Sequence, residues 1–298
     1  MISALAASAR SGLSPLILAC LAATWLVWGS TYLAIKVALV SLPPFLQMGS
    51  RFVVAGALLF GWMVFRGAPL PSAKQWRNAL IVGSLMLGGG MGGTALAEVS
   101  VGSGLVVAFI AVVPLMIALA NRVYGVKPAR GELAGIVVGL AGVLLLTQGA
   151  GFQASPAGLA AICIACLTWS IGSVLSQQSL PLAPGAMGFA SEMLCGGLVL
   201  LGLAFATGES LPAQIEPRAI AAWVYLVVAG SLIAFNAYMY LLANTSPGLA
   251  SSYTFVNPVI AMLLGVALAG ERITPAEWLA AGVILAGVVL LLRAKQRA

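Results

Sequence analysis

The stretch SSYTFVNPVIAML, residues 251–263, places Asn257 and Pro258 in the middle of a long apolar run. Inside an ordinary helix, a proline removes a backbone N–H and clashes with the carbonyl four residues earlier, at a cost of about 3 kcal/mol. The asparagine adds a polar amide to the same turn. A chain keeps such a pair where the freed backbone groups and the amide have a use, so the surroundings of this run decide the fold.

The composition places this run in a membrane protein. Of 298 residues, 61% are hydrophobic and 7% are charged, whereas soluble domains average roughly 25% charged residues. The chain contains no His and no Asp, which excludes most catalytic constellations of soluble enzymes. We therefore expect an all-α integral membrane protein in a lipid bilayer, with no metal and no cofactor.

Ten apolar segments are long enough to cross a bilayer, which takes about 20 residues per helix. They lie at 14–36, 44–65, 77–98, 103–124, 130–148, 156–177, 185–206, 218–241, 248–269 and 276–293. The connections are short and leave no room for a water-soluble domain. The first segment is too long for a removed signal peptide and lacks a cleavage site, so we expect it to be retained.

The basic residues predict the orientation of these segments. With the N-terminus in the cytoplasm, ten of the 14 Lys and Arg residues fall on the cytoplasmic side: Arg10, Arg66, Lys74, Arg77, Arg122, Lys127, Arg130, Arg293, Lys295 and Arg297. Short loops rich in Lys and Arg stay cytoplasmic, so both termini are expected inside. The net charge of +7 thus follows from topology and calls for no nucleic-acid partner.

The opening stretch has a counterpart in the first half of the chain. GLVVAFIAVVPLMIAL at 104–119 aligns with GLASSYTFVNPVIAML at 248–263, which sets Pro114 opposite Pro258. GELAGIVVGLAGVLLL at 131–146 aligns at nearly the same offset with AEWLAAGVILAGVVLL at 276–291. The offset corresponds to five spans. An odd number of spans per repeat forces the two halves into opposite orientations in the membrane.

Secondary transporters use this inverted plan, with the substrate site between the halves at interrupted helices near the midplane. We therefore predict two inverted five-helix repeats, residues 14–148 and 156–293, around a central cavity. Broken helices are tolerated at membrane depth where the freed groups face protein or a water-filled cavity. Pro114 and Pro258 are expected to mark helix breaks or gating points there. A proline kink that only shapes packing is the alternative.

Polar and aromatic side chains deep in the spans are candidates for the cavity wall. Arg51 and Glu192 occupy equivalent positions in the two repeats, where ionisable side chains are costly. They are expected to pair with each other, to serve separate polar pockets, or to hold substrate groups. Tyr253 and Asn257 lie four residues apart and share a helix face. The predicted cavity residues are Trp28, Arg51, Trp169, Glu192, Asn236, Tyr238, Tyr253 and Asn257.

A proton-coupled mechanism would need a carboxyl group within the membrane, and the candidates for such a relay are Glu98 and Glu192. Glu98 and Lys36 also fall near span ends, where long side chains can reach the interface, so a solvated role is favoured for both. The scarcity of carboxyl groups makes uncoupled export credible. The glycines of GGGMGG, residues 88–93, predict close approach of neighbouring helices.

Several stretches resemble one family of membrane proteins: WGSTYLAIK (28–36), SRFVVAGALL (50–59), the segment 236–271 and GVILAGVVLLL (282–292). They are similar to the drug/metabolite transporter superfamily and, within it, to ten-span exporters bearing two EamA domains. The resemblance implies a ten-helix basket around a central cavity, with alternating access between the halves. One departure is GVKPARGE at 125–132, opposite GERITPAE at 270–277, so the first half lacks the usual Gly-Glu after its fourth span.

Together these observations favour a secondary exporter of small metabolites, with amino acids as the predicted class, in a bacterial inner membrane. No Walker motif is present, which leaves ion coupling and facilitated efflux open. A proton-coupled exporter of drugs or quaternary amines is the alternative, and a channel is less favoured. An intramembrane enzyme is disfavoured because no His is available as a base. The expected partner is a small-molecule substrate, and the pattern is compatible with a monomer.

Overall fold

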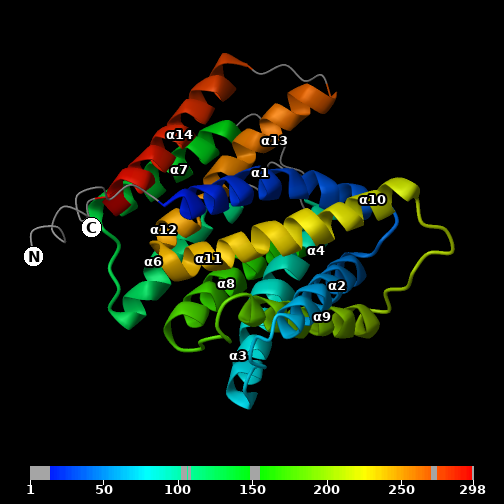
Figure 1. The fold of residues 1–298 in the computed structure, drawn as a ribbon. Coiled ribbons are helices and arrows are strands. Elements are labelled where there is room, and N and C mark those ends of the chain that lie inside the picture. The colour runs from blue at the N-terminus through cyan, green and yellow to red at the C-terminus, as the bar shows by residue number, and fades with distance from the viewer. Residues whose placement is uncertain (1–13, 102–105, 107–108, 148–154, 270–273, 297–298) are drawn as a thin grey trace, which may run out of the picture.

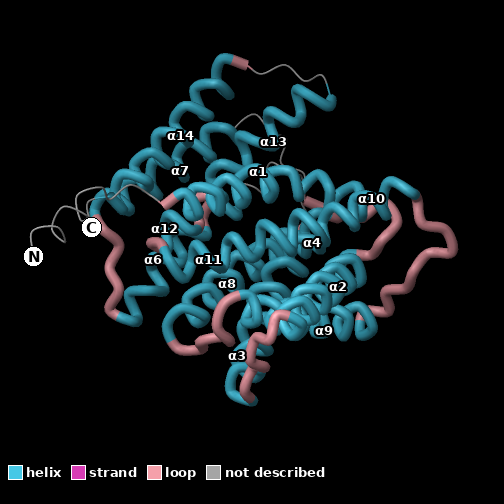
Figure 2. The backbone as a smooth tube through the Cα atoms, in the orientation of Figure 1, coloured by secondary structure: helices cyan, strands magenta, loops and turns pink. Residues whose placement is uncertain are grey.

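The computed structural model describes residues 14–101, 106, 109–147, 155–269 and 274–296, which form helices joined by loops (Figure 2). Within these described residues, eight helical units are long and apolar enough to cross a membrane, and Val113–Tyr124 is a shorter apolar helix. Arg10 and Arg297, which contributed to the orientation argument, lie outside the described residues, as do residues 270–273 of the loop compared above.

Each of the ten predicted segments overlaps one helical unit of the described residues, although Val113–Tyr124 covers only the second half of segment 103–124. We number these units as spans 1 to 10 (Figure 1). They are α1 (Pro15–Ala38); α2 (Pro44–Phe65); α3 (Ala73–Gly83) with the π-helix η1 (Ser84–Met91) and α4 (Gly92–Glu98); α6 (Val113–Asn121) with η2 (Arg122–Tyr124); α7 (Arg130–Thr147); α8 (Pro156–Gln178); α9 (Ala186–Ala206); α10 (Pro217–Tyr225) with the π-helix η3 (Leu226–Phe235) and α11 (Asn236–Asn244); α12 (Pro247–Ala250) with α13 (Tyr253–Ala269); and α14 (Pro275–Gln296).

Local capping explains where several spans begin. Ser14 and Ser155 each accept a hydrogen bond from the backbone N–H three residues on, and a proline follows each of them directly. This is the favoured chemistry of a helix N-terminus. The start of α2 lacks such a serine, and the carboxylate of Glu209 instead accepts hydrogen bonds from the N–H groups of Phe45 at 3.2 Å and Leu46 at 2.7 Å.

Equivalent spans of the two halves pack against each other. Spans 5 and 10, α7 and α14, lie side by side (Figure 1), and so do spans 2 and 7, α2 and α9. Glycines allow both approaches, because a Cβ on Gly287 would lie 2.6 Å from the backbone N of Gly139, and one on Gly197 would lie 2.8 Å from that of Val53. Close packing through small residues is how membrane helices associate without a hydrophobic driving force.

Spans 1 and 6 each pack against two spans of the opposite half. Span 1 packs against spans 8 and 9, whereas span 6 packs against spans 3 and 4. A shift of five spans turns one set of contacts into the other, as an inverted repeat requires. Both π-helices also occupy equivalent places, η1 in span 3 and η3 in span 8. The predicted fold of two inverted five-helix repeats is therefore confirmed.

The helix breaks differ from the prediction in the second half. Pro114 stands at the start of α6, directly after a turn at residues 111–112, as expected. Pro258, however, lies inside α13, and the chain turns earlier, at Ser251 and Ser252. The serines can stabilise that turn with side-chain hydrogen bonds: Ser251 Oγ donates to the Pro247 carbonyl at 2.6 Å, and the indole N–H of Trp25 donates to Ser252 Oγ at 3.0 Å.

Candidate substrate cavity

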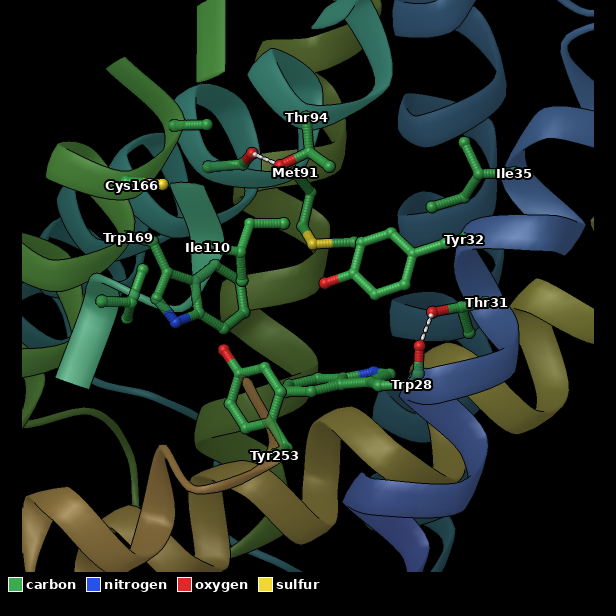
Figure 3. Close-up of a pocket in the computed structure, with 13 residues that line it drawn as sticks. Trp28, Thr31, Tyr32, Ile35, Met91, Thr94, Ile110, Cys166, Trp169 and Tyr253 are labelled. Carbon is green, nitrogen blue, oxygen red and sulfur yellow. Dashed lines mark hydrogen bonds between the residues drawn. The ribbon is translucent and has the colours of Figure 1, made fainter. Parts of the chain in front are cut away.

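A cavity of about 50 Å³ lies where spans 1, 3, 4, 6 and 9 meet, so both halves of the chain contribute to it (Figure 3). Its walls combine aromatic rings with small and aliphatic side chains and a few hydroxyl groups. The lining residues are Trp28, Thr31, Tyr32, Ile35, Gly90, Met91, Thr94, Ile110, Val113, Ala165, Cys166, Trp169 and Tyr253.

Four aromatic rings from spans 1, 6, 8 and 9 form a cluster at this cavity. The ring of Trp28 lies 4.6 Å from that of Tyr253 and 5.8 Å from that of Trp169, in edge-to-face arrangements of 73° and 76°. Tyr238 packs behind them, with its ring 5.4 Å from that of Tyr253. Such geometries suit the quadrupoles of aromatic rings and stabilise the cluster.

Hydrogen bonds hold these rings in place. The indole N–H of Trp28 donates to the carbonyl of Gly230 in η3 at 3.1 Å. The indole N–H of Trp169 donates to the hydroxyl of Tyr238 at 3.2 Å, and that hydroxyl shares a second hydrogen bond of 3.0 Å with Ser173 Oγ. Because the indole N–H groups of Trp28 and Trp169 are bound to the protein, the apolar faces of these two rings are left for the cavity.

The glycine run shapes one wall of the cavity, and its predicted packing role is confirmed. Gly90 lines the cavity, and a Cβ on it would lie 2.9 Å from the ring of Trp169. A Cβ on the neighbouring Gly89 would lie 2.5 Å from Thr168 Oγ1. These glycines therefore allow span 3 to approach span 6 closely enough for its tryptophan to face the cavity.

Three predicted cavity residues line this space, and the other ten lining residues were not predicted. Trp28, Trp169 and Tyr253 are lining residues, whereas Tyr238 is fully buried behind them. Tyr32 and Met91 also line the cavity, and Figure 3 shows the Tyr32 hydroxyl pointing into it. The signal for Tyr32 was its spacing, four residues after Trp28 and therefore on the same helix face.

Asn257 lies one helical turn beyond Tyr253 and is 1% exposed. Neither its amide nitrogen nor its carbonyl oxygen has a hydrogen-bond partner, although the carboxamide lies close to the hydroxyl of Tyr32. Most buried polar side-chain atoms have at least one partner. The Asn257 amide, beside Pro258, is therefore unpaired and makes no hydrogen bond to the helix backbone.

Arg51 and Glu192 are both buried, but the interpretation that they pair is wrong. The only ion pair among the described residues joins Arg218 and Glu216 at the surface. Arg51 instead donates through Nε to Ser231 Oγ at 2.7 Å. Both carboxylate oxygens of Glu192 are buried without a hydrogen-bond partner. Neither side chain belongs to the lining of the aromatic cavity.

Glu98 and Lys36 differ in exposure although both lie at span ends. Lys36 is exposed. Both carboxylate oxygens of Glu98 are buried and without a hydrogen-bond partner, so the interfacial interpretation is wrong for this residue. The charge of Lys36 still acts electrostatically on this carboxyl group. Among the described residues, no three His, Cys, Asp or Glu side chains come together to hold a metal ion.

Asn236 faces a different space. A groove of about 1080 Å³ lies between the beginnings of α1 and α9 and the ends of α8 and α11. Asn236 and Tyr240 of span 8 line it, together with Gln177 of span 6. Tyr238, between these two residues of span 8, belongs to the aromatic cluster. One helix therefore presents side chains to the groove and to the cluster at the cavity.

The two halves of the chain match one family separately. The model of the EamA-like transporter family matches residues 4–148 and again residues 156–293. The chain belongs to the EamA-like transporter family. The resemblance to the drug/metabolite transporters is thereby confirmed, and this family member is a multi-pass membrane transporter.

Individual relatives agree with this assignment. The transporter is 42% identical over 270 residues to the uncharacterized inner membrane transporter YedA of Escherichia coli strain K12, covering 90% of this chain and 88% of YedA. It is 27% identical over 271 residues to Protein PecM of Dickeya dadantii strain 3937, covering 90% and 87% of the two chains. A crystal structure of a protein that is 22% identical has the same fold, with a TM-score of 0.77 over 95% of this chain and 99% of that one.

Proposed function

We propose that this EamA-family transporter exports small metabolites of the amino-acid class from the cytoplasm by alternating access between its halves, residues 14–148 and 156–293. The observation that carries the proposal is the aromatic cavity, which takes lining residues from spans of both halves. A site built in this way changes its shape when the halves move relative to each other. Inverted-repeat transporters bind substrates at such interfaces.

The chemistry of the cavity suits a small metabolite. Ligand pockets typically have apolar walls and a few placed polar groups, and this cavity combines aromatic and aliphatic side chains with a few hydroxyl groups. Aromatic rings provide the wall for an apolar side chain. Tyr32 and the unpaired amide of Asn257 provide polar groups at the same place.

The groove lined by Asn236 supports a cytoplasmic route to the cavity. It lies at the beginnings of α1 and α9 and at the ends of α8 and α11, which are cytoplasmic ends if the basic loops lie inside. In that orientation the aromatic cluster separates a cytoplasmic vestibule from the cavity. We place both termini in the cytoplasm and the protein in a bacterial inner membrane, the membrane named for its relative YedA.

These side chains are consistent with two energy sources for export, proton coupling and a metabolite gradient. Glu192 is a buried carboxyl group with no partner, and a group of this kind inside a membrane is a candidate proton carrier. Facilitated efflux down a metabolite gradient needs no such group. An exporter of quaternary amines is a second candidate function, because aromatic faces attract organic cations and the cavity has four aromatic lining residues.

Counterflow in proteoliposomes tests the proposal. Vesicles preloaded with unlabelled amino acids should accelerate the entry of one labelled amino acid, with and without a pH gradient. Acceleration that saturates supports a carrier, and its dependence on the gradient separates coupled from facilitative transport. Absence of counterflow with every amino acid, together with counterflow of a quaternary amine, would replace the amino-acid proposal with the second candidate.

A further inference from the structure

Three parallel spans each carry a polar side chain one turn beyond a cavity residue. The pairs are Tyr32 and Lys36 on α1, Thr94 and Glu98 on α4, and Tyr253 and Asn257 on α13. Residues four apart share a helix face, and they are separated by about 6 Å along the axis at 1.5 Å per residue. Spans 1, 3 and 9 run in the same direction because every connection reverses the chain.

The three polar residues therefore lie on the same side of the cavity, and we call Lys36, Glu98 and Asn257 the polar layer. Tyr32 links the layer to the cavity, because its hydroxyl lies near the carboxamide of Asn257 and within electrostatic range of Glu98. The ammonium of Lys36 acts on the Glu98 carboxylate, yet the two form no ion pair within the described part of the chain.

The polar layer has unused hydrogen-bonding capacity. Both carboxylate oxygens of Glu98 and both polar atoms of the Asn257 amide are buried without a partner. Leaving such groups unpaired is unfavourable, most of all for a charged group. Glu98 and Asn257 lie on two different spans, each one turn beyond a cavity residue, so a ligand bound there could complete their hydrogen bonds.

We infer that the polar layer binds the ammonium and carboxylate groups of an α-amino acid whose side chain packs against the aromatic wall of the cavity. The Glu98 carboxylate and the Asn257 carbonyl oxygen accept from the ligand ammonium. The Lys36 ammonium and the Asn257 amide nitrogen donate to the ligand carboxylate. The inference rests on the proposed function and narrows it, because it predicts rejection of amines and acids that carry the same side chain.

Competition in counterflow tests this inference with three matched compounds. Phenylalanine carries both charges, phenethylamine lacks the carboxylate, and 3-phenylpropionate lacks the ammonium. Wild-type protein should prefer phenylalanine over either analogue. Lys36→Met should weaken the apparent affinity for phenylalanine about tenfold or more, because one charge-assisted hydrogen bond is lost. The apparent affinity for phenethylamine should not change. Glu98→Gln should weaken the apparent affinity for phenylalanine to a similar extent and leave that for 3-phenylpropionate unchanged.

Matched control variants separate this effect from a general loss of charge. Lys127→Met and Glu216→Gln change exposed residues in loops outside the polar layer, and we expect both to keep the wild-type preference. Lys36→Arg retains the positive charge and should retain the preference over phenethylamine. If a variant fails to fold, the three compounds still test the inference on wild-type protein: equal binding of phenylalanine and either analogue, measured by tryptophan fluorescence, would overturn it.

The remaining outcomes distinguish this inference from the proposed function. Amino-acid counterflow with unchanged preference in Lys36→Met and Glu98→Gln would reject the polar layer and leave amino-acid export standing. Counterflow of phenethylamine without phenylalanine would reject both the layer and amino-acid export. The expected pattern, in which each variant loses one specific discrimination, is not produced by a purely structural role.

Discussion

The ring of Trp28 lies 4.6 Å from the ring of Tyr253 at an angle of 73°, which joins span 1 of the first half to span 9 of the second. Both side chains line the same cavity. Any motion that separates the halves at this point must open this contact. The pair is therefore both part of the cavity wall and part of the contact between the two halves.

Replacement of Tyr253 tests this double role. We expect Tyr253→Ala to lower the transport rate at least about tenfold, because it removes a cavity wall and an aromatic contact worth about 0.5–1.5 kcal/mol. Tyr253→Phe keeps the ring and should stay within a few-fold of wild type. Initial rates of counterflow at equal amounts of reconstituted protein provide the measurement. Equal rates in the alanine variant and wild type would remove Tyr253 from the site.

The unpaired amide of Asn257 predicts a conflict between stability and transport. Asn257→Leu replaces a buried amide with an apolar side chain of similar volume and removes two unpaired polar atoms, each of which costs about 1–3 kcal/mol. We expect a higher unfolding temperature in detergent together with loss of transport. A lower unfolding temperature would show that the amide stabilises the fold, and normal transport would separate it from the substrate.

The buried carboxyl group of Glu192 allows a test of proton coupling. Glu192→Gln keeps the shape of the side chain and removes the proton exchange. If Glu192 carries protons, the variant should still exchange substrate in counterflow and should lose acceleration by a pH gradient. Transport measured with and without the gradient gives the result. A retained gradient effect would assign coupling elsewhere, and the other candidate is Glu98.

Gly90 predicts a steric effect on the cavity. Gly90→Ala places a Cβ 2.9 Å from the ring of Trp169, so that ring must move and the cavity must change shape. We expect reduced transport and a lower unfolding temperature. Gly61→Ala is the matched control, because Gly61 also lies in a span and a Cβ there meets no atom within 4 Å. Similar effects of the two substitutions would contradict a specific role for Gly90.

Part of the site was predictable because aromatic side chains deep in the spans are candidates for a cavity wall. Trp28, Trp169 and Tyr253 were predicted on this ground, and all three line the cavity. Met91 could not be recognised, since an apolar side chain in an apolar span carries no signal. The prediction of a solvated role for Glu98 was wrong. Its position near the end of its span indicates the membrane interface, whereas its carboxylate oxygens are buried.

The sequence alone determined the membrane class, the ten spans and the inverted repeat, because hydropathy and periodicity are properties of local runs and of their recurrence along one chain. Tertiary structure decided which side chains meet. Arg51 and Glu192 are equivalent in the repeat, yet the Arg51 guanidinium donates a hydrogen bond to Ser231, whereas the Glu192 carboxylate has no hydrogen-bond partner. The direction of each side chain depends on how helices cross, and glycine contacts between distant spans set those crossings.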